Sequence, residues 1–262
     1  MTIRRASRPG PFPGLVLLLL AASLGLNVYL FQLGRTYYLQ LNDTRLDPLG
    51  VEVYPSREIG ASRIDRPVVV LVGDSRAAEW PAPALPAGGT VLNRGIGAQT
   101  STQVLGRFDE DVAPWQPDIV VLQAGINDLK TLPFFEDRER RIIATCIRNL
   151  AEIVERSQRL GAHVIITTIV PLGRPSLVRR LVGSARVRAA IDEVNGYISS
   201  IESDHVTVLD TGLILADDDG TILRRYGRDF LHLTPEGYAA LNQALEPEIS
   251  SVTRQRDRTR QP

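Results

Sequence analysis

Short apolar runs alternate with longer amphipathic stretches along most of the chain. The runs are rich in Val and Ile and cover residues 68–72, 90–93 (the weakest), 119–124, 163–170 and 206–210. The amphipathic stretches lie around residues 99–112, 137–160, 184–203 and 235–248. Continuous apolar runs are typical of strands buried on both faces, and strand–helix alternation indicates a parallel sheet. We therefore predict one doubly wound α/β domain over residues 67–248, with helices on both faces of the sheet.

The N-terminal part has a different pattern. Residues 14–34 read GLVLLLLAASLGLNVYLFQLG without a charged side chain. About 20 helical residues span a hydrocarbon layer of roughly 30 Å, so we predict a single transmembrane signal anchor here. Arg4, Arg5 and Arg8 precede it. By the positive-inside rule residues 1–13 are cytoplasmic and the main domain is outside, in the periplasm or extracellular space if the protein is bacterial.

A cleaved secretory signal is the competing interpretation of this segment. Such signals have an apolar region of about 7–15 residues that ends at a small-x-small site. Here the apolar stretch is longer, and Ala21-Ala22-Ser23 lies in its middle, which favours an uncleaved anchor. Either interpretation exports the domain. Residues 35–66 lack sustained periodicity and are predicted to be a juxtamembrane spacer, and residues 249–262 a polar C-terminal tail.

Composition excludes several classes of partner. Thirty basic and thirty acidic residues cancel, so no overall field attracts nucleic acid, and we predict no nucleic-acid partner. The single cysteine, Cys146, lies in the helical pattern RRIIATCIRNLAEIV and is interpreted as a small buried hydrophobe. No Cys/His cluster or HExxH pattern is present, so we predict neither a metal nor another cofactor. The composition predicts no particular oligomeric state.

Three polar or small residues follow predicted strands at the end where ligands bind in open α/β sheets. They are Ser75 in VGDSR, Ala98 in NRGIGAQTS and Asn127 in AGIND. Each has an ordinary alternative, because Gly-Asp-Ser and Gly-x-Asn-Asp also occur as turns and helix caps. Of the three histidines, His163 begins a strand and His205 precedes one, which places both near the opposite rim.

His232 is therefore the remaining candidate base. It lies in GRDFLHLTPEGY, three residues after Asp229, and Thr234-Pro235 is typical of the start of a helix. In a short Asp-x-x-His loop the carboxylate can hold one imidazole nitrogen while the other faces a hydroxyl. A serine needs such a base, because its own hydroxyl is a weak nucleophile near neutral pH.

The sequence resembles the SGNH, or GDSL-type, serine hydrolases. Four blocks carry the resemblance in the family's order: VGDSR (72–76), NRGIGAQTS (93–101), AGIND (124–128) and DFLHLTPEGY (229–238). The resemblance implies a flavodoxin-like three-layer α/β/α fold and hydrolysis of esters without a metal. It implies Ser75 as nucleophile, His232 as base and Asp229 as its orienting acid. It also implies an oxyanion hole formed by Asn127 and the backbone N–H groups of Ser75 and Ala98.

Two departures from the family pattern bear on function. Ala98 stands where family members have glycine, which preserves a backbone donor if the local φ tolerates a Cβ. Arg76 and Glu79 follow the serine where Leu and Gly are common, and we predict that they shape the pocket mouth or form ion pairs. Residues 171–186 are predicted to form a lid or rim.

These observations predict a membrane-anchored, outward-facing serine esterase or acyl hydrolase. Candidate substrates are acetyl groups on cell-envelope polysaccharide and lipid or other fatty esters, and acyl transfer to a sugar is an alternative to hydrolysis. A second hypothesis, motivated by Ala98 and Arg76, is an anchored carbohydrate- or lipid-binding module that keeps the fold and has lost useful turnover.

Overall fold

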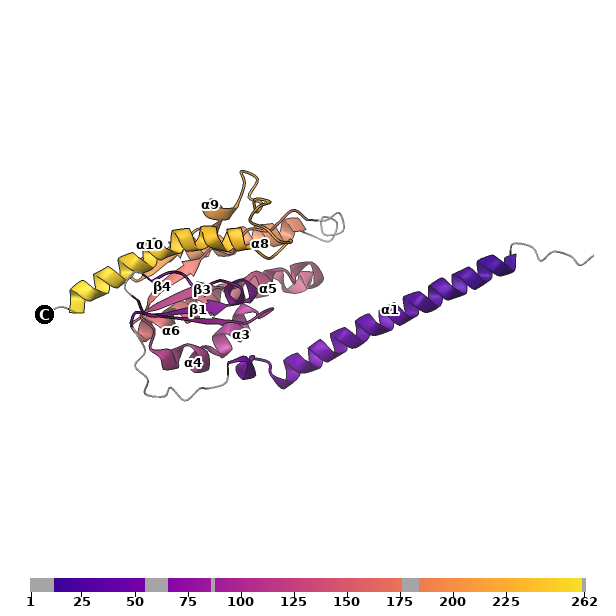
Figure 1. Cartoon of the computed structure of the whole chain (residues 1–262), viewed down its shortest axis with the longest axis horizontal. Helices are drawn as coiled ribbons and strands as arrows, with labels where there is room; N and C mark the ends of the chain where they lie inside the picture. The colour runs from indigo at the N-terminus through magenta and orange to yellow at the C-terminus, as the bar shows by residue number, and fades with distance from the viewer. Residues whose placement is uncertain (1–11, 55–65, 86–87, 176–183, 261–262) are drawn as a thin grey trace, which may run out of the picture. The chain divides into compact units, whose positions relative to one another are not determined.

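The structure is a computed structural model, which describes residues 12–54, 66–85, 88–175 and 184–260 (Figure 1). The chain divides into two compact units, Met1–Pro48 and Leu49–Pro262. The first contains the helix α1 (Phe12–Leu46). The second contains the sheet and the other described helices. Arg4, Arg5 and Arg8, on which the predicted orientation depends, lie outside the described residues.

Helix α1 is long and apolar enough to cross a membrane, and it extends beyond the predicted span of residues 14–34. Three polar side chains in its C-terminal half bond back to the carbonyl oxygen four residues earlier: Thr36, Asn42 and Thr44. The hydrogen-bonding groups of these side chains are thus satisfied within α1 itself. The helix ends shortly before Pro48, because a proline disfavours helical backbone in the residue before it. The first part of the predicted spacer is therefore helical.

Five parallel strands form one sheet in the order β2-β1-β3-β4-β5. The strands are β1 (Val68–Gly73), β2 (Thr90–Gly95), β3 (Ile119–Gln123), β4 (His163–Thr167) and β5 (Val206–Leu209). All five apolar runs are confirmed as strands, including the weakest at 90–93. Because β1 and β3 are neighbours and Gly73 pairs with Gln123, the loops after these two strands leave the sheet side by side.

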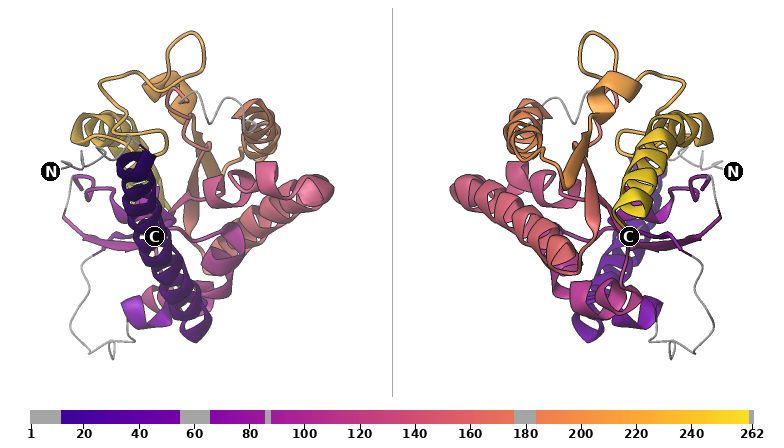
Figure 2. Two further views of the ribbon diagram at one scale, coloured as in Figure 1. Left: turned by 90° about the vertical axis from the view of Figure 1, so that its right-hand side faces the viewer. Right: turned by 90° about the vertical axis from the view of Figure 1, so that its left-hand side faces the viewer.

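Helices cover both faces of the sheet, as the end-on views of Figure 2 show. Along β1, Val68, Val70 and Val72 pack in one core cluster and Val69 and Leu71 in the other, following the alternation of side chains along a strand. The described helices are α2 (Ser75–Ala78), α3 (Ser101–Gly106), α4 (Phe108–Asp111), α5 (Ile126–Leu129), α6 (Glu139–Arg159), α8 (Ser184–Ser200), α9 (Thr211–Leu215) and α10 (Pro235–Arg260), with the 3₁₀ turns η1 (Val51–Val53), η2 (Ala113–Trp115), η3 (Leu132–Phe134) and η4 (Glu136–Arg138).

The two core clusters assign the helices to faces. Side chains of α3, α4, α6 and α8 pack in the first cluster, and side chains of α9 and α10 in the second. The parallel, doubly wound sheet between two helical layers is the three-layer α/β/α fold that the sequence predicts, and its strand order is flavodoxin-like.

The C-terminal segment differs from its prediction as a polar tail. Helix α10 continues to Arg260. Its residues Leu245, Ile249 and Val252 are buried in the second core cluster. Their spacing of three to four residues keeps one apolar stripe on the helix. The tail is therefore largely a continuation of the last helix.

Candidate active site

Ser75 begins a short helix at the carboxyl end of β1. Asp74 caps this helix, accepting a hydrogen bond from the backbone N–H of Arg76 over 3.0 Å. Gly73 lies so close to β3 that a Cβ would overlap the carbonyl oxygen of Gln123. The strand therefore needs glycine here, and the half-buried Ser75 hydroxyl stands beyond the end of the sheet.

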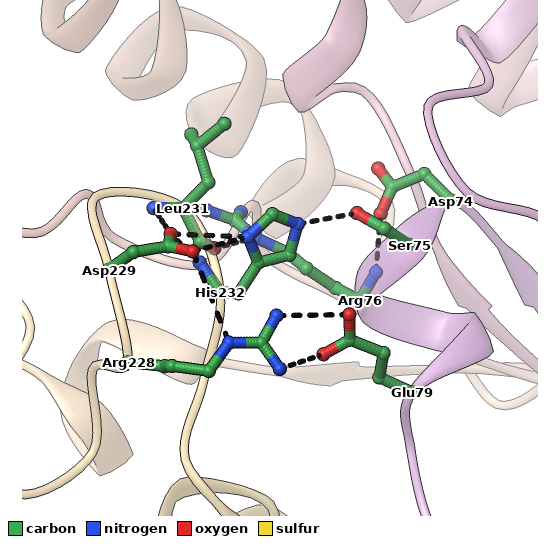
Figure 3. A network of polar contacts seen from close by, with 8 residues as sticks. All are labelled: Asp74, Ser75, Arg76, Glu79, Arg228, Asp229, Leu231 and His232. Carbon is green, nitrogen blue, oxygen red and sulfur yellow. Dashed lines mark hydrogen bonds and ion pairs between the residues drawn. The ribbon is translucent and has the colours of Figure 1, made fainter.

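The Asp229–His232 loop contacts Ser75 directly (Figure 3). His232 Nε2 lies 3.2 Å from Ser75 Oγ, and His232 Nδ1 lies 2.9 Å from Asp229 Oδ2. A carboxylate beside Nδ1 favours the tautomer with the proton on that nitrogen, which leaves Nε2 free to accept the serine proton. The loop is held at its far end by Thr234, whose hydroxyl donates to Arg225 O over 2.7 Å.

The loop folds around the carboxylate of Asp229. Its Oδ1 accepts backbone hydrogen bonds from Leu231 at 2.7 Å and from His232 at 2.9 Å. Partial burial alone would raise the pKa of Asp229, but these two N–H groups and the His232 imidazole outweigh it and lower the pKa to about 2. Asp229 is consequently ionised at neutral pH and suited to orient and stabilise a protonated His232.

Asn127 lies in the short helix α5 directly after β3, and Ala98 lies on the loop after β2. The buried Asn127 donates from Nδ2 to Gln99 O over 2.9 Å, which leaves its second amide hydrogen available. Ala98 is exposed and has φ 62°, inside the small left-handed region that residues with a Cβ can adopt. Within the described part of the chain, no acceptor bonds to the backbone N–H of Ser75 or Ala98.

One buried arginine links these loops to the nucleophile strand. Arg107 donates from Nε to Gln99 Oε1 over 2.6 Å and from Nη2 to Gly73 O over 3.1 Å. It also pairs with Asp111 at 2.8 Å. No sequence pattern pointed to Gln99 or Arg107, because each looks like an ordinary polar residue of a surface helix.

Arg76 and Glu79 have different environments. Glu79 forms an exposed ion pair with Arg228 at 3.0 Å, which agrees with the prediction that Glu79 forms an ion pair. Arg76 is fully buried, so the prediction that it shapes the pocket mouth is wrong. Its guanidinium donates to Leu231 O at 2.7 Å and Val170 O at 3.0 Å, because two loop carbonyls offer acceptors inside the protein (Figure 3 shows the first).

The other candidates lie away from this site. His163 begins β4, bonding to the Thr207 hydroxyl at 2.8 Å, and His205 lies beside it at the amino end of the sheet, as predicted. Cys146 is buried in α6. Part of the predicted lid or rim, residues 176–183, lies outside the described residues.

A family model of the GDSL-like lipase/acylhydrolase family matches residues 60–240. The chain belongs to this family. The matched range contains all four sequence blocks and every candidate residue named above. The prediction of an SGNH/GDSL hydrolase acting on ester bonds is thereby confirmed at the level of family and enzyme class.

Individual proteins are similar over different shares of the chain. The uncharacterized lipoprotein YqeF of Bacillus subtilis (strain 168) is 30% identical over 106 residues, which is 40% of this chain and 43% of that protein. The alpha1 subunit of platelet-activating factor acetylhydrolase IB from Rattus norvegicus is 25% identical over 197 residues, covering 72% of this chain and 78% of the relative. The chain thus spans less than half of the first relative.

A solved structure shares the fold. The acetylxylan esterase Axe2 of Geobacillus stearothermophilus superimposes with a TM-score of 0.55 and 20% identity, covering 71% of this chain and 94% of that one. This likeness supports the α/β/α architecture of the second unit.

Proposed function

We propose that this protein is a serine esterase in which Ser75, His232 and Asp229 form the catalytic triad. Ser75 Oγ attacks the ester carbonyl carbon while His232 Nε2 takes the hydroxyl proton. The tetrahedral intermediate collapses as His232 returns that proton to the departing alcohol, leaving an acyl-enzyme. Water, deprotonated by His232, then releases the acid and regenerates Ser75. Asp229 keeps the imidazole in the required tautomer throughout.

The negative charge on the intermediate needs donors aimed at the carbonyl oxygen. We assign this role to the backbone N–H groups of Ser75 and Ala98 and to the second amide hydrogen of Asn127. All three residues follow strands at one edge of the sheet, and the first two have unpaired N–H groups within the described residues. Alanine can adopt the φ of 62° found at Ala98. The departure from glycine is therefore no argument for a non-catalytic binding module.

The 3.2 Å contact between Ser75 Oγ and His232 Nε2 is the observation that carries this proposal. Its test is Ser75→Ala, which should abolish hydrolysis of p-nitrophenyl acetate and covalent labelling by a fluorophosphonate probe. Ser200→Ala is a matched control, because the Ser200 hydroxyl is exposed and bonds only to its own helix at Tyr197 O. Unchanged hydrolysis in Ser75→Ala would refute the triad, and no labelling of the folded wild-type protein would favour a binding module.

The substrate is proposed to be an ester with a short acyl group. Two proteins similar to this chain, one a relative and one a structural neighbour, are named for acetyl esters, a lipid in the first and a polysaccharide in the second. Their shared acyl group favours acetyl, while their different alcohols keep both surface polysaccharide and lipid as candidates. Hydrolysis rates over acyl chains from acetyl to palmitoyl should fall with length. A maximum at palmitoyl would contradict this choice.

We further propose that α1 anchors the enzyme as a single-pass membrane protein with the catalytic unit outside. The length and apolar surface of α1 support this, and one relative is named a lipoprotein. The expected result is retention of full-length chain in the membrane pellet after carbonate washing, with digestion of the catalytic unit by protease added outside spheroplasts. A shorter, soluble mature chain would instead indicate a cleaved signal.

A further inference from the structure

Residues 49–54, which the sequence assigns to a spacer, pack within the catalytic unit. The carbonyl oxygen of Leu49 accepts a hydrogen bond from Gln99 Nε2 over 2.7 Å. The Tyr54 hydroxyl donates to Gly95 O over 2.8 Å, and the Arg94 guanidinium lies 4.6 Å from the centre of the Tyr54 ring. This segment therefore contacts both ends of the loop that contains Ala98.

Gln99 connects that segment with the rest of the candidate oxyanion hole. Its side chain is buried, with Nε2 on Leu49 O and Oε1 on Arg107 Nε at 2.6 Å. Its own carbonyl oxygen accepts the Asn127 amide at 2.9 Å. Gln99 also follows Ala98 directly in the chain. Gln99 thus joins Leu49 to both candidate donors, to Ala98 through the chain and to Asn127 through a hydrogen bond.

Gly50 is the point of closest approach. Its φ is 72°, and a Cβ here would lie 2.9 Å from Ile96 Cδ1 and 3.0 Å from Gln99 Nε2. Contacts this short force a neighbour to move. The left-handed conformation favours glycine at this position, and an added Cβ would displace the side-chain ends of Ile96 and Gln99.

We propose that residues 49–54 position the oxyanion hole, holding the Ile96–Gln99 loop so that Ala98 N–H and the Asn127 amide point to the developing charge. This inference rests on the proposed function. It places the start of the catalytic machinery at Leu49 rather than at residue 67, and it makes the segment directly after α1 a determinant of turnover. Non-glycine residues in left-handed backbone persist only where their surroundings hold them, which gives Ala98 a need for such support.

The test compares two glycines in the full-length protein in detergent micelles. Gly50→Ala inserts a methyl group against Ile96 and Gln99, whereas Gly161→Ala has a similar positive φ of 78° and no atom within 4 Å of the added Cβ. Both variants place alanine at a similar positive φ, so the control corrects for the backbone part of any lost stability. Gly161 lies at the amino end of the sheet, before β4.

We expect Gly50→Ala to lower kcat on p-nitrophenyl acetate by about tenfold at unchanged KM, a fraction of the effect of losing a whole oxyanion donor. The inhibition constant of a trifluoromethyl ketone, whose adduct with Ser75 carries the oxyanion, should rise by the same factor. Gly161→Ala should keep the wild-type values of both. Tyr54→Phe, which removes a single hydrogen bond, should lower kcat by a few-fold.

Two results overturn the inference while the proposed function stands. One is equal kcat in Gly50→Ala and Gly161→Ala, and the other is a loss of kcat that matches the unfolded fraction while ketone affinity stays at the wild-type value. A wild-type protein without Ser75-dependent ester hydrolysis would instead refute the proposed function itself.

Discussion

Arg76 donates from Nε to the carbonyl oxygen of Leu231 over 2.7 Å, joining the residue after Ser75 to the residue before His232. The nucleophile helix and the histidine loop are far apart in the sequence, and this partly buried bond fixes their separation. A second bond from Arg76 to Val170 O ties in the loop after β4. The sequence suggests that Arg76 lies at the surface. Its guanidinium instead connects three loops inside the protein.

Arg76→Ala should consequently destabilise the protein strongly. It leaves the carbonyl oxygens of Leu231 and Val170 without their donors and creates a cavity, at a cost of about 2–5 kcal/mol. Arg228→Ala is the matched control, because it breaks only exposed ion pairs, with Glu79 at 3.0 Å and with Asp229 at 4.0 Å, and exposed pairs contribute little to stability. Urea unfolding of both variants in detergent measures the difference. Equal free energies of unfolding would contradict the structural role of the Arg76 hydrogen bonds.

The sheet could be predicted because its signal is local. Strand β1 is a run of Val and Leu bounded by Pro67 and Gly73, so the pattern needs no distant partner. The predicted contact of Ser75 with His232 relied on a topological rule, since loops after parallel strands share one edge.

The features that the sequence analysis did not predict depend on contacts between residues far apart in the chain. Burial of Arg76 requires carbonyl groups 94 and 155 residues away in sequence. The packing of residues 49–54 involves a backbone carbonyl at Leu49 and one side chain at Gln99, without apolar periodicity. The polar tail of the prediction is helical because Ile249 and Val252 meet a core that only the folded sheet provides.

Asp229→Asn should lower kcat by about 10³–10⁴, a typical loss when the orienting acid of a triad is replaced. The asparagine still accepts from the Leu231 and His232 N–H groups, so the loop should stay folded. Its neutral amide can neither select the Nδ1–H tautomer nor stabilise a protonated imidazole. Steady-state kinetics on p-nitrophenyl acetate test this, with the exposed Asp218→Asn as control. Activity within tenfold of wild type would mean that Asp229 has no catalytic role.

Ala98→Gly should preserve activity, with kcat within about threefold of wild type, because the donated group is a backbone N–H that both residues carry. Glycine also adopts φ 62° without strain. Asn127→Ala removes a side-chain donor and should lower kcat by roughly 10²–10³ at similar KM. Parallel kinetics distinguish the two kinds of donor. A rise in kcat above about tenfold in Ala98→Gly would show instead that alanine impairs the natural enzyme.

Asp74 should make stability fall as the pH rises from about 4 to about 6. Burial raises its pKa to about 6 from an ordinary 3.8, and the nearby Arg76 charge opposes this only in part. A carboxyl with a raised pKa in the folded state favours folding below the unfolded pKa, and this contribution is lost as the pH passes the folded value. The full difference is on the order of 3 kcal/mol.

Asp74→Asn isolates this contribution. The asparagine oxygen still accepts from Arg76 N–H at the helix cap, but the side chain no longer titrates. Urea unfolding at a series of pH values should show wild type losing free energy of unfolding relative to Asp74→Asn between pH 4 and pH 6. Asp229, whose pKa is lowered to about 2, acts in both proteins below pH 4 and cancels in the difference. If the difference between the two proteins stayed constant from pH 4 to pH 7, Asp74 would not carry its proton in the folded state.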